Sequence, residues 1–239
     1  MTIAKYTPSS TFDTPQLRLL FSCRAPLKFI KFRGINSFMA RWRKSIPLTR
    51  RFVEAEFGRG MATAKIVNSS LPKKSTKLHE VQGNNERLAG LHEARGERRR
   101  KQTIFIAQKR PHVLVHEQTH AATSRKRSIH GLPPFSPAEE AVASSMELEW
   151  LKRDDPKSYS FLLKDGRELL NSEKKNLLSS YDAGLAAAAL IERVMMKEDR
   201  AKIRKELSEE MFFSNSHMLR WVTKKCAKAQ AKRGLRTLQ

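Results

Sequence analysis

Residues 136–155 have the sequence SPAEEAVASSMELEWLKRDD, which contains the clearest helix signal in the chain. Ser136 precedes Pro137, and Glu139 follows three residues after the serine, so the segment has a capping box and a proline at the first helical position. Three large apolar residues then follow at four-residue intervals, as they do on one face of a helix. The pattern predicts a helix over about 137–154.

The rest of the carboxy-terminal half continues this helical pattern. A second helix is expected from Pro156 and ends near Gly166. A long helix is expected over about 172–213, and a last amphipathic helix over about 216–232. The predicted fold class is therefore mainly α. It has a small helical core (about 136–232) that includes one long helix, with an extended basic N-terminal arm and linker segments.

The amino-terminal half has weaker signals. Short helices are expected over about 35–46 and 49–57, and residues 59–84 have the composition of a linker. Residues 85–102 form a polar helix at best, because two glycines weaken it. Residues 103–107 are a short apolar run that fits either a helix or a strand.

Charge is the most unusual property of the chain. The 239 residues include 47 basic and 24 acidic side chains, a net charge of +23. Solubility alone requires a net charge of only about 2 to 8. The surplus lies outside residues 137–200, which hold 10 basic and 13 acidic residues. This excess predicts a polyanionic partner, first of all nucleic acid, with an anionic membrane surface as the second candidate.

The first 53 residues carry eleven basic side chains and a single acid, Asp13. An arginine-rich, acid-poor segment that contains serine is typical of a mitochondrial transit peptide. The alternative is a basic arm that embraces RNA, in a mitochondrial, nuclear or cytosolic protein. We expect a leader at 1–53, an extended basic linker with short helices at 54–135, a helical domain at 136–232 and a basic tail at 233–239. The expected location is the mitochondrial matrix.

Several classes of protein are disfavoured by what the chain lacks. Cys23 and Cys226 are the only cysteines, so neither a disulfide framework nor a cysteine-based zinc site is expected. The sequence has no run of 18 apolar residues that predicts a membrane span. It has no glycine loop of the phosphate-binding type. No cofactor and no small-molecule substrate are therefore predicted.

One short motif points to chemistry. Residues 116–120, HEQTH, resemble the active-site helix of zincin metallopeptidases. The resemblance implies that His116 and His120 are zinc ligands and that Glu117 is a general base. A third ligand is expected among the acids of the next helix, without a preference, and these are Glu139, Glu140 and Glu147.

Other features of the same segment favour a different role. Gln118 stands where zincins usually have an apolar residue, basic clusters flank the motif, and no strand series is predicted before it. His112 lies on the same helical stripe as the two motif histidines, and such a stripe can also stack on bases or pair with phosphates. We therefore predict no catalytic and no metal-binding residue.

The basic clusters are the predicted RNA contacts, because arginine binds phosphate bidentately and stacks on bases. The candidate residues are Arg41, Arg43, Lys44, Arg98, Arg99, Arg100, Lys101, Lys109, Arg110, Arg125, Lys126, Arg127, Arg220, Lys224, Lys225, Lys228, Lys232, Arg233 and Arg236. The expected function is that of a non-enzymatic component of the mitochondrial ribosome, with ribosomal RNA and neighbouring proteins as partners. The alternatives are a non-catalytic assembly factor or peripheral subunit of another mitochondrial complex, and a zinc metallopeptidase.

Overall fold

The computed structural model describes residues 33–67, 90–95, 101–106, 109–132, 137–172, 178–212 and 214–236. Within these ranges the protein has seven helices and three short strands. The predicted fold class, mainly α, is confirmed. No helix in the described ranges is both long enough and apolar enough to cross a membrane.

The amino-terminal part consists of one helix and a small sheet. Helix α1 (Arg33–Phe57) is followed by strands β1 (Lys65–Val67), β2 (Gly90–Arg95) and β3 (Lys101–Ile106). The strand order is β1-β3-β2, in which β1 is parallel and β2 antiparallel to β3. Strand β3 is therefore the middle strand of the sheet, and its buried side chains lie next to the helix that follows it in the chain.

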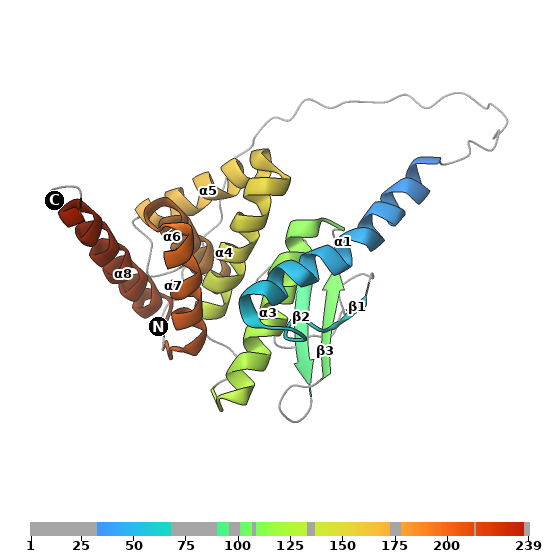
Figure 1. Cartoon of the computed structure of the whole chain (residues 1–239), viewed down its shortest axis with the longest axis horizontal. Coiled ribbons are helices and arrows are strands. Elements are labelled where there is room, and N and C mark those ends of the chain that lie inside the picture. The colour runs from blue at the N-terminus through green and yellow to red at the C-terminus, as the bar shows by residue number, and fades with distance from the viewer. Residues whose placement is uncertain are drawn as a thin grey trace, which may run out of the picture.

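Helix α3 (Pro111–Ile129) follows the sheet and lies between it and the helices downstream (Figure 1). Its apolar residues Val113 and Leu114 pack against Ile104 and Ile106 of β3. Other residues of the same helix face α4, and 12 of its 19 residues are buried. Because it is buried on two sides, this polar segment forms part of the core although its sequence has no amphipathic pattern.

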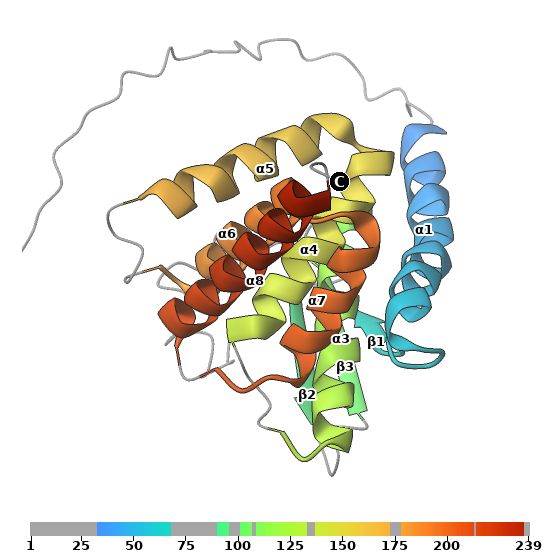
Figure 2. The ribbon, with the colours of Figure 1, turned by 60° about the vertical axis from the view of Figure 1, so that its left-hand side comes forward.

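The carboxy-terminal part is a bundle of five helices around one apolar cluster (Figure 2). Helix α6 packs closely on α4, because six of its buried residues are alanine or glycine. Helix α8 covers α6 on the outside of the bundle. The five helices are α4 (Pro137–Asp154), α5 (Pro156–Asn171), α6 (Ser180–Val194), α7 (Lys197–Glu209) and α8 (Asn215–Arg236).

Two predicted helices are confirmed by the structure. The helix over 137–154 is α4, and the helix over 216–232 lies within α8. The capping serine of α4, Ser136, lies outside the described residues, as do residues 173–177 of the predicted long helix.

The prediction of one long helix over 172–213 is wrong. The described part of this range forms α6 and α7, because Met195 and Met196 adopt extended backbone with ψ of 145° and 164°. Both helices bury apolar residues in the same cluster, so the helical period continues across the break. The sequence pattern therefore contains no sign of the break between α6 and α7.

Residues 85–102 also differ from the prediction of a polar helix. The described part forms β2 and the first residues of β3, which pair in register from Gly90–Ile106 to Arg95–Lys101. Pairing with the apolar strand β3 stabilises an extended backbone in a segment whose helix propensity is lowered by Gly90 and Gly96. In α1, by contrast, the two short helices expected on either side of Pro47 are one continuous helix.

Helix α5 does not end near Gly166, as predicted, but continues to Asn171. A Cβ atom at Gly166 would lie 2.6 Å from the Cβ atom of Ala189 and 2.8 Å from the backbone oxygen of Leu185. The glycine therefore allows α5 to approach α6 closely and does not terminate the helix.

A buried ion-pair network joins α7 to α1 and α4. The side chain of Arg204 is 2% exposed, and its Nε and Nη1 atoms each lie 2.9 Å from a carboxylate, Glu56 and Glu149 respectively. Glu56 belongs to α1, so this arginine ties the amino-terminal helix to the bundle. The folded unit thus includes α1, which extends across residue 53, and α3, which lies within 54–135.

We expect Arg204→Ala to lower the free energy of unfolding by about 3 kcal/mol, because it removes a buried cation and leaves two half-buried carboxylates unpaired. Urea denaturation followed by circular dichroism measures the change. Arg51→Ala on the exposed side of α1 is the control, and we expect it to change stability by less than about 0.5 kcal/mol. Equal effects of the two substitutions would contradict a structural role for the network.

Candidate metal centre

Helix α3 presents two histidines toward α4. Pro111 occupies the first turn of the helix, where the missing amide hydrogen has no cost, and the helix then continues without interruption through the HEQTH segment. His116 and His120 are one turn apart and point the same way. His116 is buried, and its imidazole ring lies edge-on to that of His120, with 4.9 Å between the ring centroids.

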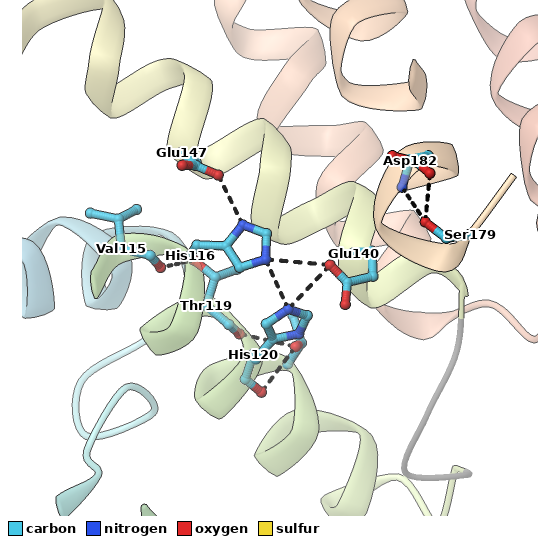
Figure 3. Close-up of polar contacts among 9 residues, drawn as sticks. Val115, His116, Thr119, His120, Glu140, Glu147, Ser179 and Asp182 are labelled. Carbon is cyan, nitrogen blue, oxygen red and sulfur yellow. Dashed lines mark hydrogen bonds and ion pairs between the residues drawn. The ribbon is translucent and has the colours of Figure 1, made fainter. Parts of the chain in front are cut away.

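Glu140 on α4 completes a cluster of three potential ligand atoms (Figure 3). Its Oε2 atom lies 3.3 Å from Nε2 of His116 and 3.5 Å from Nε2 of His120. The two Nε2 atoms are 3.1 Å apart. Three atoms from two helices thus form a nearly equilateral triangle.

This triangle has the dimensions of one face of a tetrahedral zinc site. With metal–nitrogen and metal–oxygen bonds of about 2.0–2.1 Å, tetrahedral ligand atoms lie about 3.3–3.4 Å apart. Two histidines and one glutamate are also a ligand set of catalytic zinc sites, in which the fourth position stays open. The residues present therefore fit a zinc ion.

The hydrogen bonding of Glu140 supports the same fit. Its Oε2 atom is buried, yet within the described residues no donor meets it in hydrogen-bonding geometry. A buried carboxylate oxygen without a donor is unfavourable. Either a protonated imidazole or a metal ion beside this oxygen would supply the missing positive charge.

Glu147, two turns after Glu140 on α4, orients the first histidine. Its Oε2 atom lies 3.0 Å from Nδ1 of His116. A carboxylate accepts the hydrogen bond, so Nδ1 carries a proton, and a neutral His116 ring would have its lone pair on Nε2. The Nε2 atom faces His120 and Glu140 (Figure 3). Glu147 thereby selects the tautomer of His116 that can bind a metal.

Glu117 is placed as an acid–base group. Its side chain is buried beside the two histidines, and burial raises the pKa of its carboxyl group although both imidazoles act to lower it. No hydrogen bond or ion pair holds this carboxylate within the described part of the chain.

The charges within the cluster are strongly coupled. Burial acts to lower the pKa of His116, but contacts with Glu140 and Glu147 outweigh it and raise the pKa well above 6.5. Burial acts to raise the pKa of Glu140, but the two imidazoles hold it well below its usual range. Glu140 is therefore ionised at neutral pH, the state in which it can bind a metal.

A cavity adjoins the histidines through Tyr181. The ring of Tyr181 lies 5.9 Å from that of His116, and the same tyrosine lines a cavity of about 480 Å³ between α5 and α6. Burial raises the pKa of its hydroxyl group, and the neighbouring carboxylates raise it further. The tyrosine is therefore a neutral wall between the cluster and the cavity.

The three carboxylates considered as third ligands have three different roles. Glu140 completes the ligand triangle, and Glu147 holds His116. Glu139 points elsewhere, with its Oε1 atom 3.7 Å from Nε of Arg127. All three lie within a nine-residue stretch of one helix, so only the packing of α4 on α3 distinguishes them. His112 lies beside Glu147, 4.0 Å from its Oε1 atom, and outside the triangle.

One predicted RNA-binding cluster makes internal contacts instead. Arg125 donates hydrogen bonds to the backbone oxygens of the loop at 60–63. Lys126 pairs with Glu209 at 2.9 Å. Arg127 is 1% exposed and donates to the backbone oxygens of Ser208 and Glu210, which leaves it no surface with which to contact RNA.

The other predicted RNA-binding residues are distributed over several elements. Arg41, Arg43 and Lys44 are exposed on α1, and Arg110 is exposed at the start of α3, next to the half-buried Lys109. The side chains of Arg98, Arg99, Arg100, Lys101 and Arg236 lie outside the described residues. On α8, Lys225 and Arg233 pair with acids of α7, and the remaining four residues are exposed.

No family model, curated protein or solved structure matches this chain. The chemistry of the candidate site is therefore argued from the geometry of its own residues.

We expect Glu147→Ala to weaken zinc binding by about 10- to 100-fold, because His116 loses the partner that fixes its tautomer and orientation. Competition with a chromophoric chelator measures the affinity. Glu149→Ala is the matched control, since Glu149 is a carboxylate on the same helix that pairs with Arg204 and not with the histidines. We expect this control to lower stability and leave the zinc affinity of the folded protein unchanged; an equal loss of affinity would contradict the role of Glu147.

A second pair of variants tests the packing behind Glu140. A Cβ atom at Gly184 would lie 2.5 Å from the Cβ atom of Glu140, and one at Gly166 would lie 2.6 Å from that of Ala189. Both Gly→Ala variants introduce a similar clash and should lower the melting temperature, but only Gly184→Ala displaces a ligand. We therefore expect it alone to weaken zinc binding, and equal zinc affinities in the two variants would contradict this geometry.

Proposed function

We propose that this chain is a zinc-dependent hydrolase of the metallopeptidase type. His116, His120 and Glu140 would hold the ion, Glu117 would serve as general base and Glu147 would orient His116. The observation that carries the proposal is the convergence of three ligand atoms, from two helices, at separations of 3.1, 3.3 and 3.5 Å. Nothing in the spacing of the motif alone requires this convergence.

The residues around the triangle suit the hydrolysis of an amide bond. A bound zinc ion supplies Lewis acidity, which polarises a carbonyl group and lowers the pKa of water. Glu117 accepts a proton from the water that attacks the carbonyl carbon, and returns a proton to the leaving amine nitrogen as the carbon–nitrogen bond breaks. Its raised pKa and its lack of a fixed partner in the described residues suit a group that gains and loses a proton in each cycle.

The surroundings of the motif also support this function. Helix α3 is buried and rests on a sheet, so the motif lies on a rigid scaffold, as a catalytic site requires. Gln118, which departs from the zincin pattern, is 1% exposed and occupies the core position that an apolar residue would fill.

The role of a ribosomal RNA-binding protein in mitochondria stays a prediction from composition, as does the absence of enzymatic activity. The geometry favours the peptidase alternative, because charge alone does not account for four ionisable side chains that meet in the core.

We expect the purified protein to bind about one zinc ion per chain and to cleave an unstructured protein such as casein. Glu117→Gln should keep the zinc and lower the cleavage rate by about 10²- to 10⁴-fold, because the general base is lost. His120→Ala should lose both zinc and activity. Elemental analysis after gel filtration and a fluorescent casein assay give the two readouts.

The control for these variants is His130→Ala, which removes an exposed histidine just after the end of the same helix. We expect it to change neither zinc content nor activity. Wild-type protein that takes up no zinc, or cleavage that persists in Glu117→Gln, would overturn the proposed function.

A further inference from the structure

Helix α8 carries a row of four cations along its outer face. Arg220, Lys224, Lys228 and Lys232 follow one another at four-residue intervals, and all four are exposed. Residues four apart on a helix are neighbours on its surface, so the row is continuous and extends over about 18 Å. We call these four residues the α8 row.

The α8 row differs from Lys225 and Arg233 of the same helix in having no acidic partner among the described residues. Lys225 lies 2.5 Å from Glu206, and Arg233 lies 3.8 Å from Asp199, so the side of α8 next to α7 is neutralised. Within the described residues, no carboxylate forms an ion pair with any member of the row. Like charges four residues apart repel each other, which is unfavourable for the helix as long as no counter-charge is bound.

The opposite face of α8 fixes the row in place. Met218, Val222 and Cys226 are buried in the main apolar cluster. The helix therefore cannot rotate to hide the row, and its backbone is ordered before any partner binds. A preorganised row of charges loses less conformational entropy on binding than a flexible tail does.

We propose that the α8 row binds the phosphate backbone of a nucleic acid strand. A duplex presents about one phosphate charge per 1.7 Å of its axis, so a row of this length meets several phosphates wherever it docks. Recognition would be independent of sequence, because lysine and arginine on phosphates position a protein without reading bases.

The same helix is less suited to an anionic membrane. Helices that lie on membranes insert an apolar face beside their cations. The apolar face of α8 is already used in the bundle, where Met218 and Val222 are fully buried. Nucleic acid, which requires only the charged face, is therefore the favoured partner.

The test measures the salt dependence of binding with the full-length chain. Fluorescence anisotropy of labelled single-stranded RNA, duplex RNA and duplex DNA is followed between about 50 and 200 mM salt. The first variant changes the α8 row to alanine (R220A/K224A/K228A/K232A). The matched control removes four exposed cations of α5 and α7 instead (K157A/R167A/K197A/K202A), so that both variants have the same net charge.

We expect the variant of the α8 row to reduce the slope of log affinity against log salt by about three, since each phosphate contact contributes roughly 0.7–0.9. The control variant should retain most of the slope. Equal loss in the two variants would show that net charge alone drives binding, and would overturn the proposal. Stronger binding to phosphatidylglycerol vesicles than to any of the three nucleic acids, lost in the same variant, would also overturn it and assign the row to membranes.

Measuring the zinc content of the variant of the α8 row distinguishes a failure of the nucleic-acid proposal from a failure of the proposed hydrolase function. The row contributes no group to the metal centre, so zinc binding should equal that of the wild type. Loss of zinc in this variant would mean that the fold has been disturbed, and a variant of Lys224 and Lys228 alone then provides the comparison, with half of the change in slope expected.

Discussion

The contact between α3 and α4 is the interaction on which the candidate site depends. Each helix contributes two ionisable side chains to one face, His116 and His120 from α3 and Glu140 and Glu147 from α4. If either pair were buried alone, its side chains would lose their hydration without gaining polar partners, which is unfavourable. Facing each other, imidazoles and carboxylates compensate one another. The Oε2 atom of Glu140 faces both imidazoles, at 3.3 and 3.5 Å, and this convergence is the basis of the proposed metal centre.

Small side chains on α6 support this contact from behind. The buried alanines of α6 and Gly184 let its backbone lie directly against Glu140, so the ligand has little freedom to move away. The same close approach brings Tyr181 beside His116. The position of Glu140, the tautomer of His116 and one wall of the neighbouring cavity therefore depend on the packing of α3, α4 and α6.

Local patterns predicted some elements and missed others for identifiable reasons. Helix α4 was predictable because its start signals and its apolar period lie within one segment. Strand β2 was not, because its stability comes from pairing with β3 and not from its own residues. The break between α6 and α7 was hidden, since both helices bury apolar residues in one cluster. Helix α3 has no amphipathic pattern because it is covered on two sides and buries polar as well as apolar residues.

The sequence by itself determined the helical class, the surplus of positive charge and the spacing of His116 and His120, because each depends on composition or on the geometry of a single helix. It also placed three carboxylates within reach as a third ligand. Only the tertiary structure decided that Glu140 faces the histidines, that Glu147 holds one of them and that Glu139 pairs with Arg127. The physical reason is that distances within a helix follow from the backbone, whereas distances between helices follow from the packing of all the side chains between them.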